Sequence, residues 1–440
     1  MRSTRRPLVA MVVVLAAILA GCSGTDDESD VSQQDDAASE GSDQSGEQAA
    51  AAGQQATVTY WHAYSEEGPE VETLREVLIP RFEEDHPGIT IEQVAVPYND
   101  LRQKLITATA GDALPCLVRS DIIWVPELAE LGVLVALDEE MDDFDAIAAR
   151  TFDGPLSTTA WDGNHYGLPL STNTRVLMYD AEVLADAGFA EPPSTFEELE
   201  ALADALEGTD RYAFADGGTG GWNLFPWIWS GGGQITDADI SQASGYLDSA
   251  ESVAAIELLV SLYERGQIPD IMVGDEGGIA TSDGLPQGRY ATILDGPWMF
   301  PIFQGQYPDF DLQTAPVPAG PGGSISVVGG EDIVLTTACE DPDAAMEVLR
   351  FFLGEESQTE MAKVGQMSVL EELDVTALND YYDVFVEQLA TARARTPHPQ
   401  YPQIEEVLST QVQRAFSGEV SVREALTAAA EQIDDLLATS

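Results

Sequence analysis

The sequence predicts an α/β protein with more than one lobe. Its 440 residues exceed the roughly 150 residues of an average domain, so the chain can form two or three lobes. Apolar residues make up 44% of the chain and charged residues 22%, which is a globular composition. Strand-like segments alternate with helical ones, and this order is typical of a mostly parallel sheet covered by helices on both faces.

The first α/β unit begins at residue 57. Segments 57–61 and 89–96 are predicted strands, and the helix predicted between them, over 72–85, ends at Pro87-Gly88. The unit continues with a helix over 100–110, a short strand at 117–118 and a helix over 126–131 that Gly132 caps.

A second unit follows the turn predicted at Trp161-Asp162-Gly163. Ser194 and Glu197 have the spacing of a capping box, which would begin a helix that runs to Leu206. Strands are predicted at 166–170, 176–179, 290–294 and 332–337, and a helix at 251–265. From Pro342 onward the pattern is helical nearly to the end, with interruptions at Pro397, Pro399 and Pro402.

The N-terminus predicts export and a lipid anchor. Basic residues precede an apolar run over 8–20, which has the length of a signal peptide and is too short to span a bilayer. The run ends in Leu19-Ala20-Gly21-Cys22, which resembles the lipobox of bacterial lipoproteins, so residues 1–21 would be removed and Cys22 would carry the lipid. An ordinary signal peptide with an incidental cysteine is the alternative. Arg5-Arg6 leaves open whether export uses the general or the twin-arginine route.

Residues 22–56 are predicted to be a disordered acidic tether. They contain nine acids and no base, and are otherwise mostly Ser, Gln, Gly and Ala, so they cannot form a core. We therefore expect the folded body on the extracytoplasmic face of the cell membrane, or in a periplasm, attached through lipid alone.

The charge of the chain excludes nucleic acid as a partner. Acids outnumber bases 77 to 19, for a net charge of -58, whereas phosphate binding requires basic patches. An acidic surface with only two lysines, Lys104 and Lys363, fits an adaptation to high salt or a genome that prefers arginine, and the sequence leaves both open.

Motifs for catalysis, cofactors and metals are lacking. The sequence has no phosphate-binding G-x-x-x-x-G-K-[ST] loop and no G-x-S-x-G elbow, and its four histidines are scattered. No cysteine pair has the spacing of metal ligands. We therefore expect no cofactor, no metal and no enzymatic activity. A secreted glycan-degrading enzyme stays open, because paired carboxylates cannot be recognised among so many acids.

From residue 57 to its end, the chain resembles the extracellular solute-binding proteins of ABC importers, in the maltose and oligosaccharide branch (family 1). No single segment carries the resemblance, but the order and spacing of the matching segments do. They are V-T-Y-W-H-A-Y at 58–64, L-P-C-L-V-R-S-D-I-I-W-V-P-E-L-A-E-L-G at 114–132, Y-G-L-P-L-S-T-N-T-R-V-L-M-Y at 166–179, L-D-G-P-W at 294–298 and the Gly329-Gly330-Glu331 turn before a strand.

The resemblance implies a two-lobed, periplasmic-binding-protein-like II fold with a hinge and an interlobe cleft. It places 57–168 with 330–378 in one lobe, and 172–325 with 380–440 in the other. It further implies a monomer that captures a small carbohydrate, of the maltose type, and delivers it to an ABC permease in the membrane. A binder of an anionic solute, such as a glycerol phosphate compound, remains an alternative that would require converging arginines.

The resemblance also indicates ligand-binding residues, on loops that follow strand ends or begin helices, where α/β sheets place ligands. Aromatic planes and short polar side chains suit a sugar, which offers apolar C–H faces and hydroxyls. The indicated residues are His62, Tyr64, Glu66, Ser120, Asp121, Trp124, Asn173, Trp222, Trp298, Gly330 and Glu331.

Each of these residues has an alternative role. Trp298 and Trp222 could pack in the core, and Asp121 and Asn173 could cap a helix or a turn. Arg119 and Arg175 could serve an anionic ligand or pair with the surrounding acids.

A disulfide between Cys116 and Cys339 is also expected. These are the only cysteines besides Cys22, and export places them in an oxidising compartment. By the resemblance, Cys116 begins one strand and Cys339 follows another, both at the far end of one lobe's sheet. Where related chains have an aspartate after Pro115, this one has Cys116.

Overall fold

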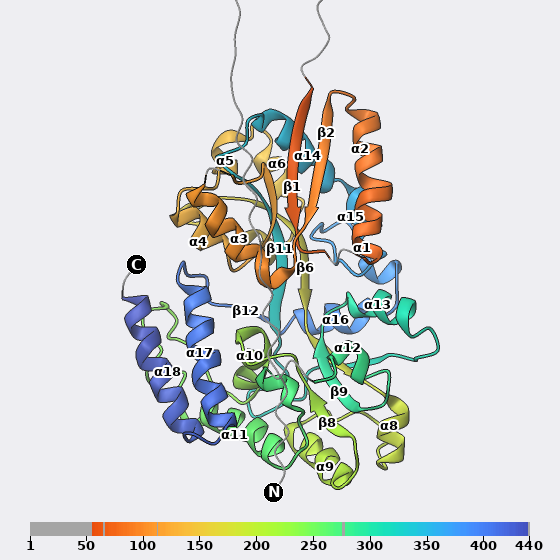
Figure 1. Ribbon diagram of the computed structural model, residues 1–440, viewed down its shortest axis with the longest axis vertical. Coiled ribbons are helices and arrows are strands. Elements are labelled where there is room, and N and C mark those ends of the chain that lie inside the picture. Colours follow the sequence, from red (N-terminus) through yellow and green to blue (C-terminus); the bar gives the residue numbers. More distant parts are fainter. Residues whose placement is uncertain (1–54, 65–66, 112, 275–277, 439–440) are drawn as a thin grey trace, which may run out of the picture. The chain divides into compact units, whose positions relative to one another are not determined.

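The computed structural model of the chain describes residues 55–64, 67–111, 113–274 and 278–438. The expected signal peptide, Cys22, the tether up to residue 54, and Glu66 lie outside these ranges. No helix within them is long and apolar enough to cross a membrane. The body has the expected two-lobed α/β fold, with one main sheet in each lobe (Figure 1).

The first lobe contains a six-stranded mixed sheet in the order β12-β11-β3-β1-β2, with β6 also paired to β11. Strand β1 is parallel to β2 and β3, whereas β11 is antiparallel to β3 and β6. The sheet is thus less uniformly parallel than the alternation predicts, because β11 returns from the second lobe. The strands are β1 (Ala56–His62), β2 (Ile89–Ala95), β3 (Leu117–Asp121), β6 (Leu168–Thr174), β11 (Val327–Leu335) and β12 (Arg393–Ala394).

Apolar side chains alternate across this sheet, so both of its faces are covered. On β3, Leu117 packs on one face and Val118 on the other. The first face is covered by α1 (Pro69–Thr73), η1 (Leu74–Leu78), α2 (Ile79–Asp85), α14 (Pro342–Phe352) and α15 (Glu355–Ala362). The second is covered by α3 (Tyr98–Ala110) and α4 (Val125–Glu130). Around them lie α5 (Leu137–Glu140), α6 (Phe144–Ala148), α7 (Asp153–Ser157) and the hairpin β4 (Ala160–Trp161) and β5 (Asn164–His165), which turns at Asp162-Gly163 as expected.

The second lobe contains a four-stranded sheet in the order β10-β7-β9-β8. Its strands are β7 (Val176–Tyr179), β8 (Tyr212–Ala215), β9 (Tyr290–Asp295) and β10 (Gln313–Ala315). One face packs on α9 (Phe196–Leu206), α10 (Gly221–Ser230), α11 (Ala250–Glu264), α17 (Tyr401–Phe416) and α18 (Val422–Leu437). The other packs on α12 (Thr281–Gly284), α13 (Met299–Gln306) and α16 (Tyr382–Leu389). The shorter α8 (Ala181–Asp186), η2 (Asp270–Val273) and η3 (Val375–Ala377) complete the described elements.

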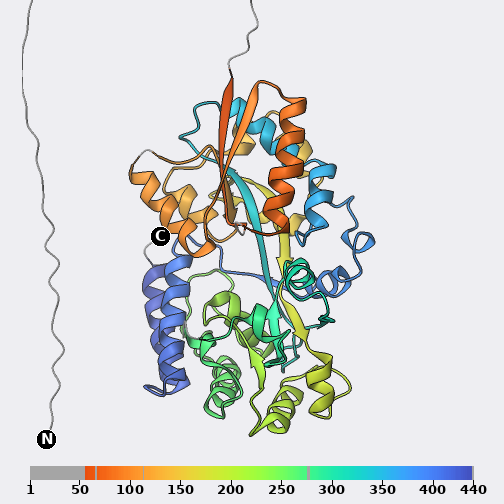
Figure 2. The same ribbon diagram turned by 45° about the vertical axis from the view of Figure 1, so that its right-hand side comes forward.

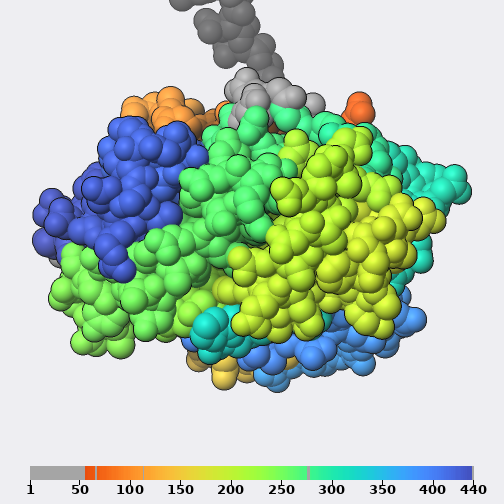
Figure 3. Space-filling view, turned by 90° about the horizontal axis from the view of Figure 1, so that it is seen from below, coloured from red at the N-terminus to blue at the C-terminus, as the bar shows by residue number. Residues whose placement is uncertain are grey.

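The C-terminal helices belong to the second lobe, although they follow a return to the first. Between α16 and α17 the chain forms β12, which pairs with β11. Helices α17 and α18 then pack on α10 and α11 (Figures 1 and 2). Seen from below, the blue C-terminal segment lies beside the green segment that contains α11 (Figure 3).

The chain passes between the lobes along extended strands. Strand β6 lies in the first sheet and β7 in the second, with only Arg175 between them. Strand β11 runs beside β6 in the opposite direction (Figure 1). The ends of these strands therefore bring residues of both lobes together at the middle of the body.

Two local expectations are wrong. Gly329, Gly330 and Glu331 lie inside β11 rather than in a turn before it, because β11 continues past them and pairs with β6. The N-cap of α9 is Thr195 rather than Ser194: the Thr195 hydroxyl accepts a bond from Glu198 N at 3.2 Å. Glu198 then reaches back to Ser194 N at 2.7 Å, so the capping pattern is present one residue later.

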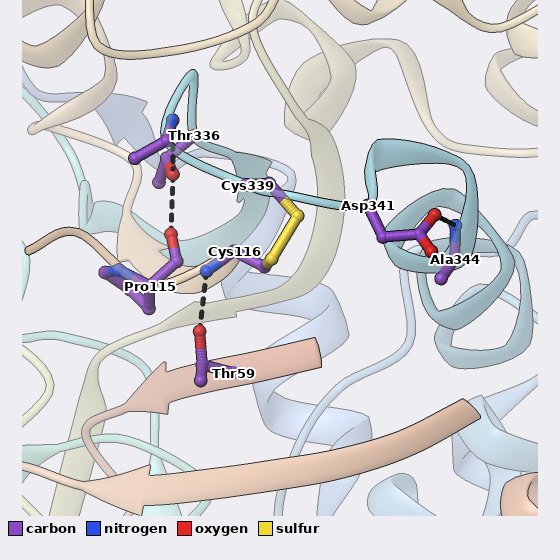
Figure 4. The surroundings of a disulfide bond; sticks show 8 residues. Thr59, Pro115, Cys116, Thr336, Cys339, Asp341 and Ala344 are labelled. Atoms are coloured by element: carbon purple, nitrogen blue, oxygen red, sulfur yellow. Dashed lines mark hydrogen bonds between the residues drawn. A yellow bond between two sulfur atoms is a disulfide. The ribbon is translucent and has the colours of Figure 1, made fainter. Parts of the chain in front are cut away.

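A disulfide joins Cys116 and Cys339 at the start of β3 and the end of β11 (Figure 4). Their Cα atoms are 4.3 Å apart, and the two strands pair up to Leu117 and Leu335. Thr336 N donates to Cys116 O at 2.9 Å, which extends the pairing to the bridge itself. Asp341 then caps α14, so the bridge fixes the chain just before this helix begins (Figure 4).

Candidate functional site

Two tryptophans from separate loops of the second lobe lie side by side. Trp222 is in the first turn of α10, and Trp298 caps α13 after β9. Their ring centroids are 6.2 Å apart and their planes differ by 29°, and both side chains are partly exposed. Both side chains pack against buried apolar clusters, and their accessible parts together offer an apolar aromatic surface next to the strands that link the lobes.

Glycines allow the Trp298 ring to lie where it does. A Cβ atom on Gly296 would lie 2.1 Å from the ring, so only glycine lets the indole fold back over this turn. Gly365, which has a φ of +97°, packs against the Trp298 backbone, and a Cβ atom there would be 2.8 Å from the Trp298 Cα. The sequence Gly296-Pro297-Trp298 thus forms a tight turn that fixes the position of the ring.

Asp295 also holds this turn and the Trp298 ring in place. Its Oδ1 accepts a bond from Gly296 N at 2.8 Å, and the Trp298 side chain also bonds to its carboxyl group. Burial raises the pKa of Asp295 to about 6, against the opposing effect of the nearby Arg175.

The strands between the lobes place Asn173 beside Trp222. Asn173 on β6 pairs with Gly329 on β11. A Cβ atom on Gly329 would lie 2.2 Å from Asn173 Oδ1 and 2.7 Å from the Trp222 ring, so the missing side chain lets these groups meet. Asn173 Oδ1 is buried and has no hydrogen-bond partner among the described residues, which leaves a polar group free next to the aromatic surface.

Asp121 links the first lobe to this surface. Its Oδ1 accepts bonds from Ile123 N at 3.0 Å and from Arg395 Nη2 at 2.9 Å. The Arg395 guanidinium in turn lies 5.4 Å from the Trp222 ring centroid. Asp121, at the end of β3, is thereby connected to the tryptophan pair through a single side chain.

Tyr98 joins Asp121 and was not among the expected site residues. Its hydroxyl donates to Asp121 Oδ2 at 2.6 Å, and its ring stacks on Trp124 with centroids 5.3 Å apart. Tyr98 is 45% exposed whereas Trp124 is buried, so Tyr98 presents the accessible ring. The sequence feature that could have indicated Tyr98 is its position shortly after β2, as the first residue of α3.

A second polar network surrounds Arg119 in the first lobe. Arg119 Nη2 lies 2.7 Å from Glu331 Oε2, and its guanidinium stacks over Tyr64, 4.2 Å from the ring centroid. Arg119 also donates to Gln366, which donates to Glu70. Burial raises the pKa of Glu70 to about 7 and also raises that of Glu331, while Arg119 opposes both shifts.

Three of the expected ligand-binding residues, His62, Ser120 and Gly330, have contacts within the first lobe and not with the tryptophan pair. His62 is fully buried between Gln93 Oε1, 2.6 Å from its Nε2, and Tyr64 N, which donates to its Nδ1. Burial lowers the pKa of His62 to about 4, so the ring is neutral at neutral pH. Ser120 donates to the backbone of Asp121. Gly330, with a φ of +144°, lets β11 approach Ser171 O, which a Cβ atom would meet at 2.4 Å.

Three arginines near Trp222, Trp298 and Tyr64 are buried and paired with carboxylates. Arg119 pairs with Glu331 at 2.7 Å, Arg175 with Asp216 at 2.8 Å and Arg395 with Asp121 at 2.9 Å. Further acids in the same region are Glu70, Asp295 and Glu405. Within the described ranges this region therefore carries more acids than bases.

Comparisons with known proteins agree with this architecture. Residues 65–359 match the family described as bacterial extracellular solute-binding protein. A putative binding protein of Brucella abortus is 25% identical over 385 residues, which cover 84% of this chain and 90% of that protein. A maltooligosaccharide ABC transporter solute-binding lipoprotein of Streptococcus pneumoniae is 28% identical over 296 residues, covering 61% and 66%.

The solved structures include an ABC transporter solute-binding protein from Thermotoga lettingae with bound α-D-tagatose. It superposes with a TM-score of 0.78 at 26% identity, and the match covers 87% of this chain and all of that one. The fold described above is thus shared over nearly the whole folded body.

Proposed function

This chain belongs to the bacterial extracellular solute-binding protein family, and we propose that it captures a neutral carbohydrate between its lobes for delivery to an ABC permease. The observation that carries the proposal is the partly exposed pair of Trp222 and Trp298, beside the buried Asn173 Oδ1, which has no hydrogen-bond partner among the described residues. A sugar ring would stack its C–H face on an indole and direct its hydroxyls to the polar groups around it.

The charges favour a neutral ligand over an anionic one. Each of the three arginines near the tryptophans and Tyr64 already has its carboxylate, so a phosphate would have to displace a buried partner. It would also enter a region where acids outnumber bases. A neutral polyol would neither displace a buried carboxylate nor be repelled by the excess of acids. The names of the S. pneumoniae and T. lettingae proteins, which refer to a maltooligosaccharide and to tagatose, support the same class of ligand.

Ligand capture would use the strands between the lobes as a hinge. We expect the ligand to bind the second lobe first, through the tryptophans, and closure to bring Asp121, Tyr98 and the rest of the first lobe against it. No covalent step is required. Micromolar affinity corresponds to about 8 kcal/mol, which stacked rings and several hydrogen bonds can supply.

The proposal is tested by calorimetric titration of the purified protein with a small panel. The panel contains maltotriose, mannotriose, galactobiose and D-tagatose as neutral sugars, and glycerol 3-phosphate as the anion. We expect one of the neutral sugars to bind at micromolar or tighter affinity and glycerol 3-phosphate to show no binding. Tight binding of glycerol 3-phosphate alone would contradict the proposal. Release of smaller sugars during overnight incubation would indicate a glycan-degrading enzyme instead.

We further propose that Cys22 anchors the protein to the outer face of the cell membrane. The support is the Leu19-Ala20-Gly21-Cys22 sequence, together with the lipoprotein named in S. pneumoniae. A Cys22→Ser variant should carry no lipid and should not be cleaved between Gly21 and residue 22. If the variant were processed and retained at the membrane like the parent, the anchor would lie elsewhere.

A further inference from the structure

Arg175 lies between the two loops that carry the tryptophans, although it belongs to neither. It follows β6 and precedes β7, at the point where the chain leaves the first sheet for the second. Its side chain is only 2% exposed. A ligand can therefore contact the partly exposed indoles without contacting the Arg175 side chain.

The Arg175 guanidinium holds both loops at once. Nη1 donates to the backbone carbonyl of Trp222 at 3.0 Å, and Nη2 donates to the backbone carbonyl of Leu294. Trp222 is in the first turn of α10, and Leu294 lies one residue before Asp295, whose carboxyl group binds both Gly296 N and the Trp298 side chain. One planar group thus links the backbones that set the positions of the two indoles.

Asp216 keeps the guanidinium in this orientation. It accepts a bond from each Nη atom, at 2.9 and 2.8 Å, and its Oδ1 also accepts from Gly217 N at 2.7 Å and Asn223 Nδ2 at 2.5 Å. The plane of the guanidinium is thereby fixed by two bonds to one carboxylate, which a lysine could not reproduce.

Stability alone does not explain this pair. Both side chains are buried, and a buried ion pair is often no more stabilising than apolar residues of similar volume. Arg175 Nε is buried without a hydrogen-bond partner among the described residues, which adds a further cost. The pair provides directed hydrogen bonds to two backbone carbonyls, which apolar residues could not provide.

We infer that Arg175 is a positioning residue that sets the separation and tilt of the Trp222 and Trp298 rings and thereby the affinity of the site. The inference rests on the proposed function for its effect on affinity. Its effect on the rings does not depend on any ligand.

Two variants test the inference. Arg175→Lys keeps the charge but cannot bond to Asp216 and to both carbonyls together. The double variant Arg175→Met with Asp216→Leu replaces the ion pair by apolar side chains, so it can fold without a buried unpaired charge. Arg350→Met is the matched control, because Arg350 also pairs with a carboxylate, Asp143 at 2.7 Å, but lies in the first lobe and is partly exposed.

The primary measurement is circular dichroism of the ligand-free protein in the exciton region of the indoles, because two stacked indoles give a coupled signal there that depends on their geometry. Trp222→Phe identifies that signal by removing it. We expect both Arg175 variants to lose it, while cooperative unfolding by urea stays like the parent. Arg350→Met should keep it. Titration with maltotriose should then show an affinity at least tenfold lower for both Arg175 variants than for Arg350→Met.

Two results would overturn the inference. One is an unchanged coupled signal in a folded double variant, since the rings would then be held by packing alone. The other is failure of both Arg175 variants to fold, which would make Arg175 a residue required for folding. If the parent bound none of the panel sugars, the proposed function would fail, and the coupled signal would still decide the role of Arg175.

Discussion

The Trp298 side chain packs against the protein on one side and leaves part of its ring accessible. The ring folds over Gly296 and stacks beside Trp222, and its side chain is partly rather than fully buried. We therefore expect Trp298→Ala to weaken binding of the best sugar of the panel by about 2 kcal/mol, roughly thirtyfold in Kd. Its free energy of unfolding should fall by less than the roughly 3–5 kcal/mol of a fully buried tryptophan. Titration and urea denaturation of the same sample measure both effects.

Trp161→Ala is the control for this substitution. Trp161 is also partly exposed, but it lies in the β4–β5 hairpin of the first lobe, where its Nε1 donates to Glu130 at 3.4 Å. It should bind sugar like the parent. An unchanged Kd for Trp298→Ala combined with a large loss of stability would remove Trp298 from the site.

Glu70 predicts a dependence of stability on pH. Burial raises its pKa to about 7 in the folded chain, against about 4.3 when unfolded, so the folded state binds the proton more tightly. This contribution to stability is complete below the unfolded pKa and is lost as the pH rises through 7. Glu70→Gln stays neutral and can still accept the bond from Gln366. Because pH 5 already lies above the unfolded pKa, the gain in free energy of unfolding of the variant over the parent should be larger at pH 8 than at pH 5, by about 1–2 kcal/mol when reduced for partial exposure.

Glu72→Gln, on the same helix but exposed, supplies the comparison. Its stability relative to the parent should be the same at pH 5 and pH 8. Denaturant curves at both pH values decide the matter: an equal stability difference for Glu70→Gln at the two values would mean that folding does not raise the pKa of Glu70.

The sequence could indicate individual site residues only where a local pattern surrounded them. Trp298 stands out because Gly296 and Pro297 precede it, and the structure leaves its side chain partly exposed. Arg395 offers no such signal: it pairs with Asp121 across 274 positions of sequence, and only the return of the chain through β12 brings them together. His62 is the last residue of β1 as Asp121 is of β3, but its ring is fully buried within the first lobe.

At the level of elements, the bridge between β3 and β11 predicts a separable contribution to stability. It closes a loop of 223 positions that includes most of the second lobe, and crosslinks of this kind contribute typically about 2–4 kcal/mol. Cys116→Ala with Cys339→Ala should lower the free energy of unfolding by that amount. Because the strand pairing remains and the bridge lies at the far end of the sheet from Asp121, sugar affinity should not change.

Urea denaturation of the double variant and of the reduced parent should give matching curves, since both lack the same bond. A thiol assay in a Cys22→Ser background supplies the control. Two reactive thiols in the unreduced protein would show that the bridge is absent in solution.

Local pattern predicts the elements themselves better than their ends. The strand predicted at 332–337 is the buried half of β11, whereas Gly329 and Gly330 have a turn-like composition and are extended only because β6 pairs with them. Strand β12 has two residues and no apolar pattern, so it exists through its contact with β11 alone. Helix α10 contains Pro226 and several aromatic residues, which obscure its helical period.

For the whole molecule, the net charge of -58 predicts that salt stabilises the fold. Repulsion among carboxylates acts over a screening length that falls from about 30 Å at 0.01 M to about 3 Å at 1 M salt. The melting temperature should therefore rise by several degrees across this range of NaCl at pH 7. At pH 4, close to the isoelectric point of about 4.1, the same salt should have little effect. An equal rise at both pH values would attribute the effect to preferential hydration rather than to screening.

A second salt series separates a neutral ligand from an anionic one. Stacking on Trp222 and Trp298 and hydrogen bonds to uncharged hydroxyls do not depend on screening, so the Kd of a neutral sugar should stay within about twofold from 0.05 to 1 M NaCl. An anion bound by arginine would respond strongly to salt, because its attraction to a guanidinium is screened. Glycerol 3-phosphate and the best sugar of the panel should be titrated at four salt concentrations. A sugar affinity that changed tenfold across the series would show that charged groups, rather than the two indoles, dominate binding.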